Sequence, residues 1–184
     1  PPRGNPRPNR IRRLMQAKVA VIRHPRENVK KCSLRRLHGN PNFEFFRASE
    51  KFFFDATGFL LLEMGAPPVT PADAGLPILL LDSTWRLLPS LRAKVGGKFT
   101  ARSIPPEIRT AYPRVSKVFG DPAGLATVEA LYAATKLSGN PDPSVLKGYP
   151  FARKFMEING WLSDLPSPDF FDASESVFCG GAQI

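Results

Sequence analysis

Residues 78–85 constrain the fold of this chain most strongly. Four aliphatic residues run directly into Asp82, Ser83, Thr84 and Trp85. An unbroken aliphatic run of this kind is typical of a parallel strand that is buried on both faces. Polar residues at the carboxyl end of such a strand lie where open α/β sheets usually bind ligands. The alternative is purely structural: a buried strand followed by a helix whose cap is Asp82 or Ser83.

The segments around this strand predict an α/β domain. Alternating or apolar patterns favour strands over 18–22, 43–46, 98–104 and 115–119, and 3.6-residue patterns favour helices over 34–37, 85–95, 125–134 and 150–161. The aromatic and leucine-rich segments 52–54 and 59–62 predict a hairpin, with Gly58 at a positive φ. Strands separated by helices are the pattern of an α/β fold.

The length of 184 residues suits one domain. We expect a basic, disordered arm over 1–13, a single α/β domain over 14–162 and an acidic tail over 163–184. The arm either touches RNA phosphates or only solubilises the chain. No apolar run reaches the roughly 20 residues that span a bilayer, and no secretory signal is visible. We therefore expect no membrane contact.

Cysteine usage favours a reduced, cytoplasmic protein. The two cysteines, Cys32 and Cys179, are too few for a disulfide framework. His24 and Cys32 could share a metal ion, but nothing in the sequence supplies the remaining ligands. We therefore predict no metal site.

The net charge of +10 and the pI near 10.1 indicate a polyanionic partner, most often nucleic acid. The alternative is a basic but inert surface. The candidate phosphate contacts are Lys30, Lys31, Arg35, Arg36, Arg102, Arg109, Arg114 and Lys117. We expect roughly half of them to be solvated surface charges only.

The helix expected over 125–134 follows a loop over 120–124. Free backbone N–H groups at this helix start suit an anion or a carboxylate. Glu129 lies on the flank of the apolar face, where it is either a ligand group or the partner of a nearby arginine.

Seven segments, taken in order, resemble the RNA aminocarboxypropyltransferases. That family comprises ribosomal-RNA enzymes and their relatives, the DTW-domain transfer-RNA enzymes. Together the segments span roughly residues 18–161. They are Lys30–Ser33 followed by Leu37, Thr70–Asp73, Leu80–Trp85, Leu88–Pro89, Arg109–Arg114, Gly124–Ala130 and Phe155–Asn159.

The chain lies between the two groups of that family. After the aspartate it carries Ser83-Thr84-Trp85, which is nearer the DTW form than the Cys-Ser-Trp of the ribosomal enzymes. Residues 112–125 replace the Asn-Pro-Val-Asn-Tyr-Gly-like loop of the ribosomal enzymes, and the cysteine-rich N-terminal motif of DTW proteins is absent. Ribosomal and transfer RNA both stay open as substrates.

The resemblance implies a SPOUT-like sheet flanked by helices, with a C-terminal trefoil knot over about 78–138 and a small N-terminal α/β part. It implies a monomeric transferase in ribosome biogenesis. Such an enzyme binds S-adenosylmethionine and moves its 3-amino-3-carboxypropyl group to the nitrogen of a uridine-type base. Two alternatives are a SPOUT-like RNA methyltransferase with the same cofactor and a non-catalytic RNA-binding or ribosome-assembly module.

The resemblance also implies roles for individual residues. The two catalytic candidates are Asp82, as acceptor of the proton from the base, and Trp85, which packs against the transferring side chain. Ser33 and Thr127 hold the aminocarboxyl end, and Glu129 orders the loop or binds the amino group. The cofactor-binding candidates are Ser33, Leu81 (through its backbone, to the ribose), Trp85, Leu125, Thr127 and Glu129.

Overall fold

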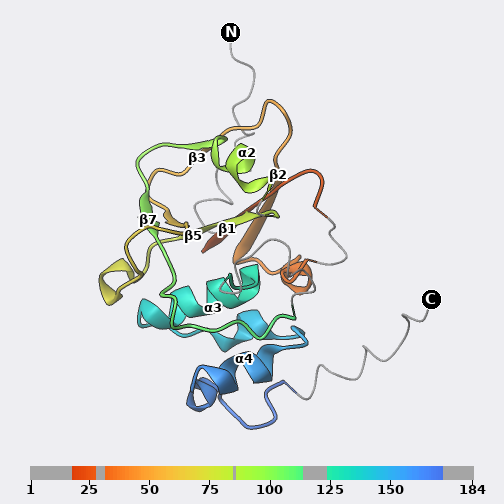
Figure 1. Cartoon of the computed structure of the whole chain (residues 1–184), viewed down its shortest axis with the longest axis vertical. Helices are drawn as coiled ribbons and strands as arrows, with labels where there is room; N and C mark the ends of the chain where they lie inside the picture. Colours follow the sequence, from red (N-terminus) through yellow and green to blue (C-terminus); the bar gives the residue numbers. More distant parts are fainter. Residues whose placement is uncertain (1–17, 28–31, 85, 114–123, 172–184) are drawn as a thin grey trace, which may run out of the picture.

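The structure is a computed structural model that describes residues 18–27, 32–84, 86–113 and 124–171. Its centre is a five-stranded sheet in the order β2-β1-β5-β4-β7 (Figure 1). Every pairing in this sheet is parallel. The strands are β1 (Val19–Arg23), β2 (Phe43–Arg47), β4 (Leu60–Leu62), β5 (Ile78–Asp82) and β7 (Thr100–Arg102). The α/β expectation is confirmed, and the aliphatic run forms the middle strand.

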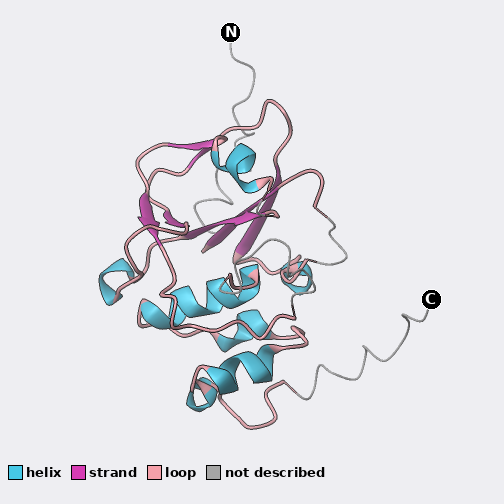
Figure 2. Ribbon diagram, viewed as in Figure 1, coloured by secondary structure: helices cyan, strands magenta, loops and turns pink. Residues whose placement is uncertain are grey.

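Helices cover both faces of the sheet (Figure 2). The short α2 (Leu88–Arg92) lies on one face, and α3 (Thr127–Leu137) lies on the other with α4 (Ala152–Ile158) beyond it. Single 3₁₀ turns form at Arg35–Leu37, Pro71–Asp73, Pro143–Leu146 and Leu162–Asp164. The expected helices over 34–37, 85–95, 125–134 and 150–161 all contain helical turns, although α2 and α4 are shorter than predicted.

Two hydrophobic clusters explain why the middle strands are so apolar. Val21 and Leu80 pack toward α3, against Leu131 and its neighbours. The intervening residues of β1 and β5, such as Leu79, pack toward α2 in the second cluster. Successive side chains of a strand point to opposite faces, so burial on both faces requires an unbroken aliphatic run.

The predicted hairpin over 52–62 is wrong. β3 (Phe54–Asp55) pairs in parallel with β6 (Val95–Gly96), while β4 pairs in parallel with β5 and β7. Both edges of β4 are therefore occupied within the main sheet, which suits Leu61 at 0% exposure. Gly58 does adopt the predicted positive φ, at 83°, but the turn moves the chain from one sheet to the other.

The first part of the expected acidic tail packs against the domain. Asp164 accepts hydrogen bonds from the Tyr132 hydroxyl and from Lys136 Nζ, both at 2.6 Å. Phe171 is 3% exposed and joins the cluster around α3. The expected arm over 1–13 and the strand over 115–119 lie outside the described residues. Within the described part, no helix is both long and apolar enough to cross a bilayer.

Candidate functional site

Three charged residues form a row across the carboxyl ends of adjacent strands. The register pairs Arg23 of β1 with Arg47 of β2 on one side and with Asp82 of β5 on the other. Residues at one register position of a parallel sheet face the same side. Two positions earlier the strands carry Val21 and Leu80, which pack toward α3. The row therefore lies on the α3 side of the sheet, at its carboxyl edge.

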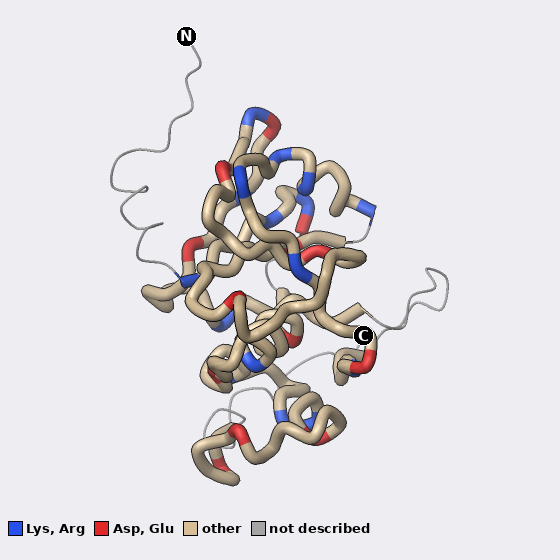
Figure 3. Tube along the Cα trace, turned by 90° about the vertical axis from the view of Figure 1, so that its left-hand side faces the viewer, with Lys and Arg blue, Asp and Glu red and all other residues tan. Residues whose placement is uncertain are grey.

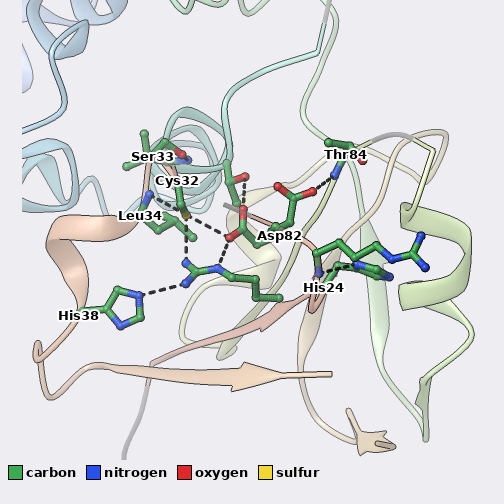
Figure 4. Close-up of polar contacts among 12 residues, drawn as sticks. His24, Cys32, Ser33, Leu34, His38, Asp82 and Thr84 are labelled. Carbon is green, nitrogen blue, oxygen red and sulfur yellow. Dashed lines mark hydrogen bonds and ion pairs between the residues drawn. The ribbon is translucent and has the colours of Figure 1, made fainter. Parts of the chain in front are cut away.

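The carboxylate of Asp82 joins three segments that are far apart in the sequence (Figure 4). Its Oδ2 accepts from Arg23 Nε at 2.7 Å and from Cys32 Sγ at 3.1 Å. Its Oδ1 accepts from Thr127 Oγ1, at the start of α3, at 3.4 Å. Asp82 is only 8% exposed, so this pairing is what makes a buried charge tolerable. Oδ1 has the one long contact and is the oxygen with room for another donor.

Arg23 is 7% exposed and donates to three side chains. Besides Asp82, it reaches Cys32 Sγ at 3.0 Å from Nη2 and His38 Nε2 at 3.2 Å from Nη1. Partial burial and the charge of Arg23 lower the pKa of His38, so the imidazole is neutral at pH 7 and its Nε2 accepts. Burial and the neighbouring Asp82 raise the pKa of Cys32 to about 12, so its sulfur carries a proton that it donates.

The start of α3 supplies further polar groups beside Asp82. Val128 donates its backbone N–H to Ser33 Oγ at 3.3 Å, so Ser33 and Thr127 meet at the same helix end. Ser83 Oγ is buried without a hydrogen-bond partner among the described residues. A buried hydroxyl of this kind is free to bond with a ligand or a water molecule. Leu81 and Leu125 are half-buried.

Glu129 orders the loops in front of α3. It is 0% exposed and accepts from Thr110 Oγ1 at 2.6 Å, Ala111 N at 2.9 Å, Ala126 N at 2.8 Å and the Tyr149 hydroxyl at 3.0 Å. These donors are hydroxyls and backbone N–H groups. The described contacts of Glu129 therefore do not include the arginine partner that was one of the two expectations. Four donors also fill the usual acceptor capacity of a carboxylate.

The predicted phosphate contacts are placed unequally. Arg35 and Arg36 are exposed, and the exposed Arg109 donates to the carbonyl of Ile158 at 2.8 Å. Arg102 forms an ion pair at 2.8 Å with Asp73, whose side chain is 3% exposed. Lys30, Lys31, Arg114, Lys117 and also Trp85 lie outside the described residues. Along the described trace, Lys and Arg positions are interspersed with Asp and Glu (Figure 3).

The sequence did not single out Arg23 and His38, and it assigned Cys32 no role at the site. One signal was available for Arg23. A cation that ends an otherwise apolar strand needs a buried partner, and Asp82 ends the other apolar strand in the same way. His38 carried no such signal, because its position depends on the packing of the loop after Leu37.

A hollow of about 420 Å³ opens beside this cluster, at the carboxyl ends of β1 and β2. Its volume is within the range of small-molecule sites. Its walls are Arg23, His24, Pro25, Glu27, His38, Phe45, Phe46 and Arg47.

A solved structure shares this fold. The SAM-dependent rRNA:acp-transferase Tsr3 from Vulcanisaeta distributa superposes with a TM-score of 0.61, over 85% of this chain and 85% of that one, at 24% sequence identity. No protein-family model matches the chain, and neither does any curated protein. At this level of identity the likeness establishes the fold, and the predicted α/β architecture is that of Tsr3.

Proposed function

We propose that this protein transfers the 3-amino-3-carboxypropyl group of S-adenosylmethionine to a uridine-type base of ribosomal RNA. One observation carries the proposal: Cys32-Ser33, Asp82 and Thr127-Val128 meet at the carboxyl edge of a fold shared with an rRNA aminocarboxypropyltransferase. These are segments on which the sequence resembles that family.

The chemistry of the side chains at this edge suits S-adenosylmethionine. The amino-acid end of the cofactor needs donors for a carboxylate and acceptors for an ammonium group. Ser33 and Thr127 offer hydroxyl groups at the start of the 11-residue α3, where the N–H of Val128 bonds to Ser33 and that of Ala126 bonds to Glu129. The buried Ser83 hydroxyl is a further donor without a partner among the described residues. Oδ1 of Asp82, 3.4 Å from Thr127 Oγ1, adds an acceptor at this edge.

The cofactor, when bound, supplies an activated sulfonium, so the protein mainly has to position the reacting groups. The base nitrogen must lose a proton to react. Oδ1 of Asp82 is the candidate acceptor, because Oδ2 is already bonded to Arg23 and Cys32. Arg23 fixes the orientation of this carboxylate, and Glu129 fixes the loop that leads into α3.

The finer features of the resemblance belong to the same proposal. We infer a SPOUT-like trefoil knot in the region 78–138, a monomeric state and a cytoplasmic location. Trp85 would pack against the transferring side chain. The parallel sheet and the position of α3 against β5 are compatible with this topology.

Calorimetric titration with S-adenosylmethionine tests cofactor binding. Ser33→Ala and Thr127→Val should each weaken the affinity by up to about tenfold, the usual effect of one lost hydrogen bond. Ser90→Ala is the matched control, because Ser90 is an exposed helical serine on α2, away from the cluster. Equal affinity in all four proteins would contradict the proposed cofactor site.

The identity of the products tests the reaction. Incubation with unmodified small-subunit rRNA or transfer RNA should add an aminocarboxypropyl mass to a uridine-type nucleoside and release methylthioadenosine. Methyl addition with release of S-adenosylhomocysteine would instead identify a methyltransferase. Asp82→Asn should lower the transfer rate by about 10²-fold or more, as expected for the loss of a general base. An unchanged rate would remove Asp82 from that role.

A further inference from the structure

The His38 ring lies at the wall of the hollow at the carboxyl ends of β1 and β2, where two contacts orient it. It stacks on the Phe45 ring with centroids 3.9 Å apart and planes at 20°. Its Nε2 accepts from Arg23 Nη1 at 3.2 Å. Despite these two contacts the residue is exposed, and it lines the hollow. An aromatic ring that is fixed in orientation and open to solvent costs little entropy when a second ring stacks on it.

Exposed cationic side chains lie near this ring. Arg47 lines the same hollow and is exposed, and its Nη2 donates to the carbonyl of Pro25 at 3.3 Å. Arg35 is exposed on the 3₁₀ turn that leads to His38. The carboxylate of the hollow, Glu27, accepts from the backbone N–H of Thr84 at 2.6 Å. An exposed stacking ring with arginines nearby is the pattern that binds single-stranded nucleic acid.

The hollow lies on the same row of strand ends as Asp82, the proposed proton acceptor. Arg47, Arg23 and Asp82 occupy one register position across β2, β1 and β5. Arg23 separates the hollow from Asp82, and it bonds to both His38 and Asp82 (Figure 4). The start of α3 approaches Asp82 from its Oδ1 side, while Arg23 binds Oδ2. A strand that enters across β2 and β1 would pass Arg23 before its reacting base meets Oδ1 of Asp82.

We propose that this hollow binds one nucleotide of the single-stranded substrate RNA. The base stacks on the outer face of His38, and Arg47 contacts a flanking phosphate. The inference rests on the proposed function for the identity of the substrate, and it adds the place where the RNA strand enters. The mostly aromatic and cationic walls fit a nucleotide, whose base has an apolar face and whose backbone is anionic.

Fluorescence anisotropy with a labelled, single-stranded oligouridylate measures this binding without requiring catalysis. His38→Leu removes the stacking ring, and His38→Phe retains a ring that stacks on Phe45. His38→Leu should weaken RNA binding about fivefold or more, by a similar factor at low and at higher salt, because stacking is not an ionic contact. His38→Phe should bind within about twofold of wild type. Arg47→Gln should weaken binding and reduce the salt slope by about 0.7.

Two controls separate RNA contact from damage to the fold or to the cofactor site. Phe53→Ala removes a ring that is 66% exposed but does not line the hollow, and it should leave RNA affinity unchanged. Calorimetry with S-adenosylmethionine should give one affinity for wild type and for both His38 variants. The inference fails if His38→Leu binds RNA as wild type does. It also fails if His38→Phe is as weak as His38→Leu, or if His38→Leu loses cofactor and RNA together.

The two proposals fail in different ways. If RNA binding depends on the His38 ring but no aminocarboxypropyl product forms, the hollow is an RNA site and the proposed reaction is wrong. If the product forms and RNA binding is indifferent to His38 and Arg47, the reaction stands and the strand enters elsewhere.

Discussion

At the scale of single residues, the ion pair between Arg23 and Asp82 is the most consequential contact. Its two side chains are 9% and 11% exposed. Removing one partner of a buried pair leaves the other charge without compensation. We therefore expect Arg23→Met to lower the free energy of unfolding by about 3–5 kcal/mol, measured by urea denaturation.

The matched control is a solvent-accessible pair. Arg92 and Glu63 are 33% and 35% exposed, so Arg92→Met should change the free energy of unfolding by no more than about 1 kcal/mol. The double variant Arg23→Met/Asp82→Leu should recover much of the loss, because it buries no lone charge. Equal losses in Arg23→Met and Arg92→Met would contradict a buried, compensated pair.

The ion pair between Arg23 and Asp82 also affects the pKa of the neighbouring Cys32 thiol. The pKa of this thiol rises to about 12, first because of burial and then because of Asp82. We expect iodoacetamide to modify Cys32 slowly near pH 8, since the thiolate is the reactive form. The experiment needs a Cys179→Ser background, with modification followed by mass spectrometry as the pH is raised. Labelling of the folded protein that reaches its full rate below pH 9 would contradict the shift.

The raised pKa of Cys32 also affects stability. The folded protein holds the thiol proton more tightly than the unfolded chain, whose ordinary value is 9.0. The contribution of Cys32 to stability is therefore complete below about pH 9 and is lost as the pH rises toward 12. Cys32→Ala should remove this part of the alkaline decline.

At the scale of elements, Glu129 ties α3 to the segments before and after it. The Tyr149 hydroxyl donates to its carboxylate at 3.0 Å, and burial together with the charge of Glu129 raises the pKa of Tyr149. Tyr149→Phe removes one hydrogen bond to a buried charge and should cost about 1.5–3 kcal/mol of unfolding free energy. Tyr112→Phe, at a residue 39% exposed, should cost little, and a similar loss in both variants would contradict the role of Glu129.

The sequence predicted correctly those elements whose structure follows from their own local hydrophobic pattern. The middle strand β5 and the helix α3 belong to this group, because an apolar run and a helical repeat are local signals. The hairpin over 52–62 failed for the opposite reason. Phe54 of β3 and the leucines of β4 fit any buried strand, and the partner strands β6 and β7 come about 40 residues later.

At the scale of the whole molecule, the site is a product of strand order. Asp82, Ser33 and Thr127 were available from the resemblance, and the structure does bring them together. Arg23 and His38 become part of the site because β1 lies between β5 and β2. No local sequence pattern specifies this strand order. Arg102, expected at a phosphate, instead stabilises the turn over Pro71–Asp73 through Asp73. A long-range ion pair of this kind becomes visible only when the fold is known.

The net charge of +10 leads to a prediction about the molecule as a whole. The segment 1–13 carries five arginines, and each phosphate contact that it makes to single-stranded RNA adds about 0.7 to the salt slope of binding. If the segment binds RNA, its deletion should lower this slope by up to about 3.5 and weaken binding most at low salt. Anisotropy across a salt series measures the slope, and Arg47→Gln gives the change that one contact causes. A deletion variant with an unchanged slope would show that the segment makes no phosphate contact, and the RNA contacts would then lie beyond residue 13.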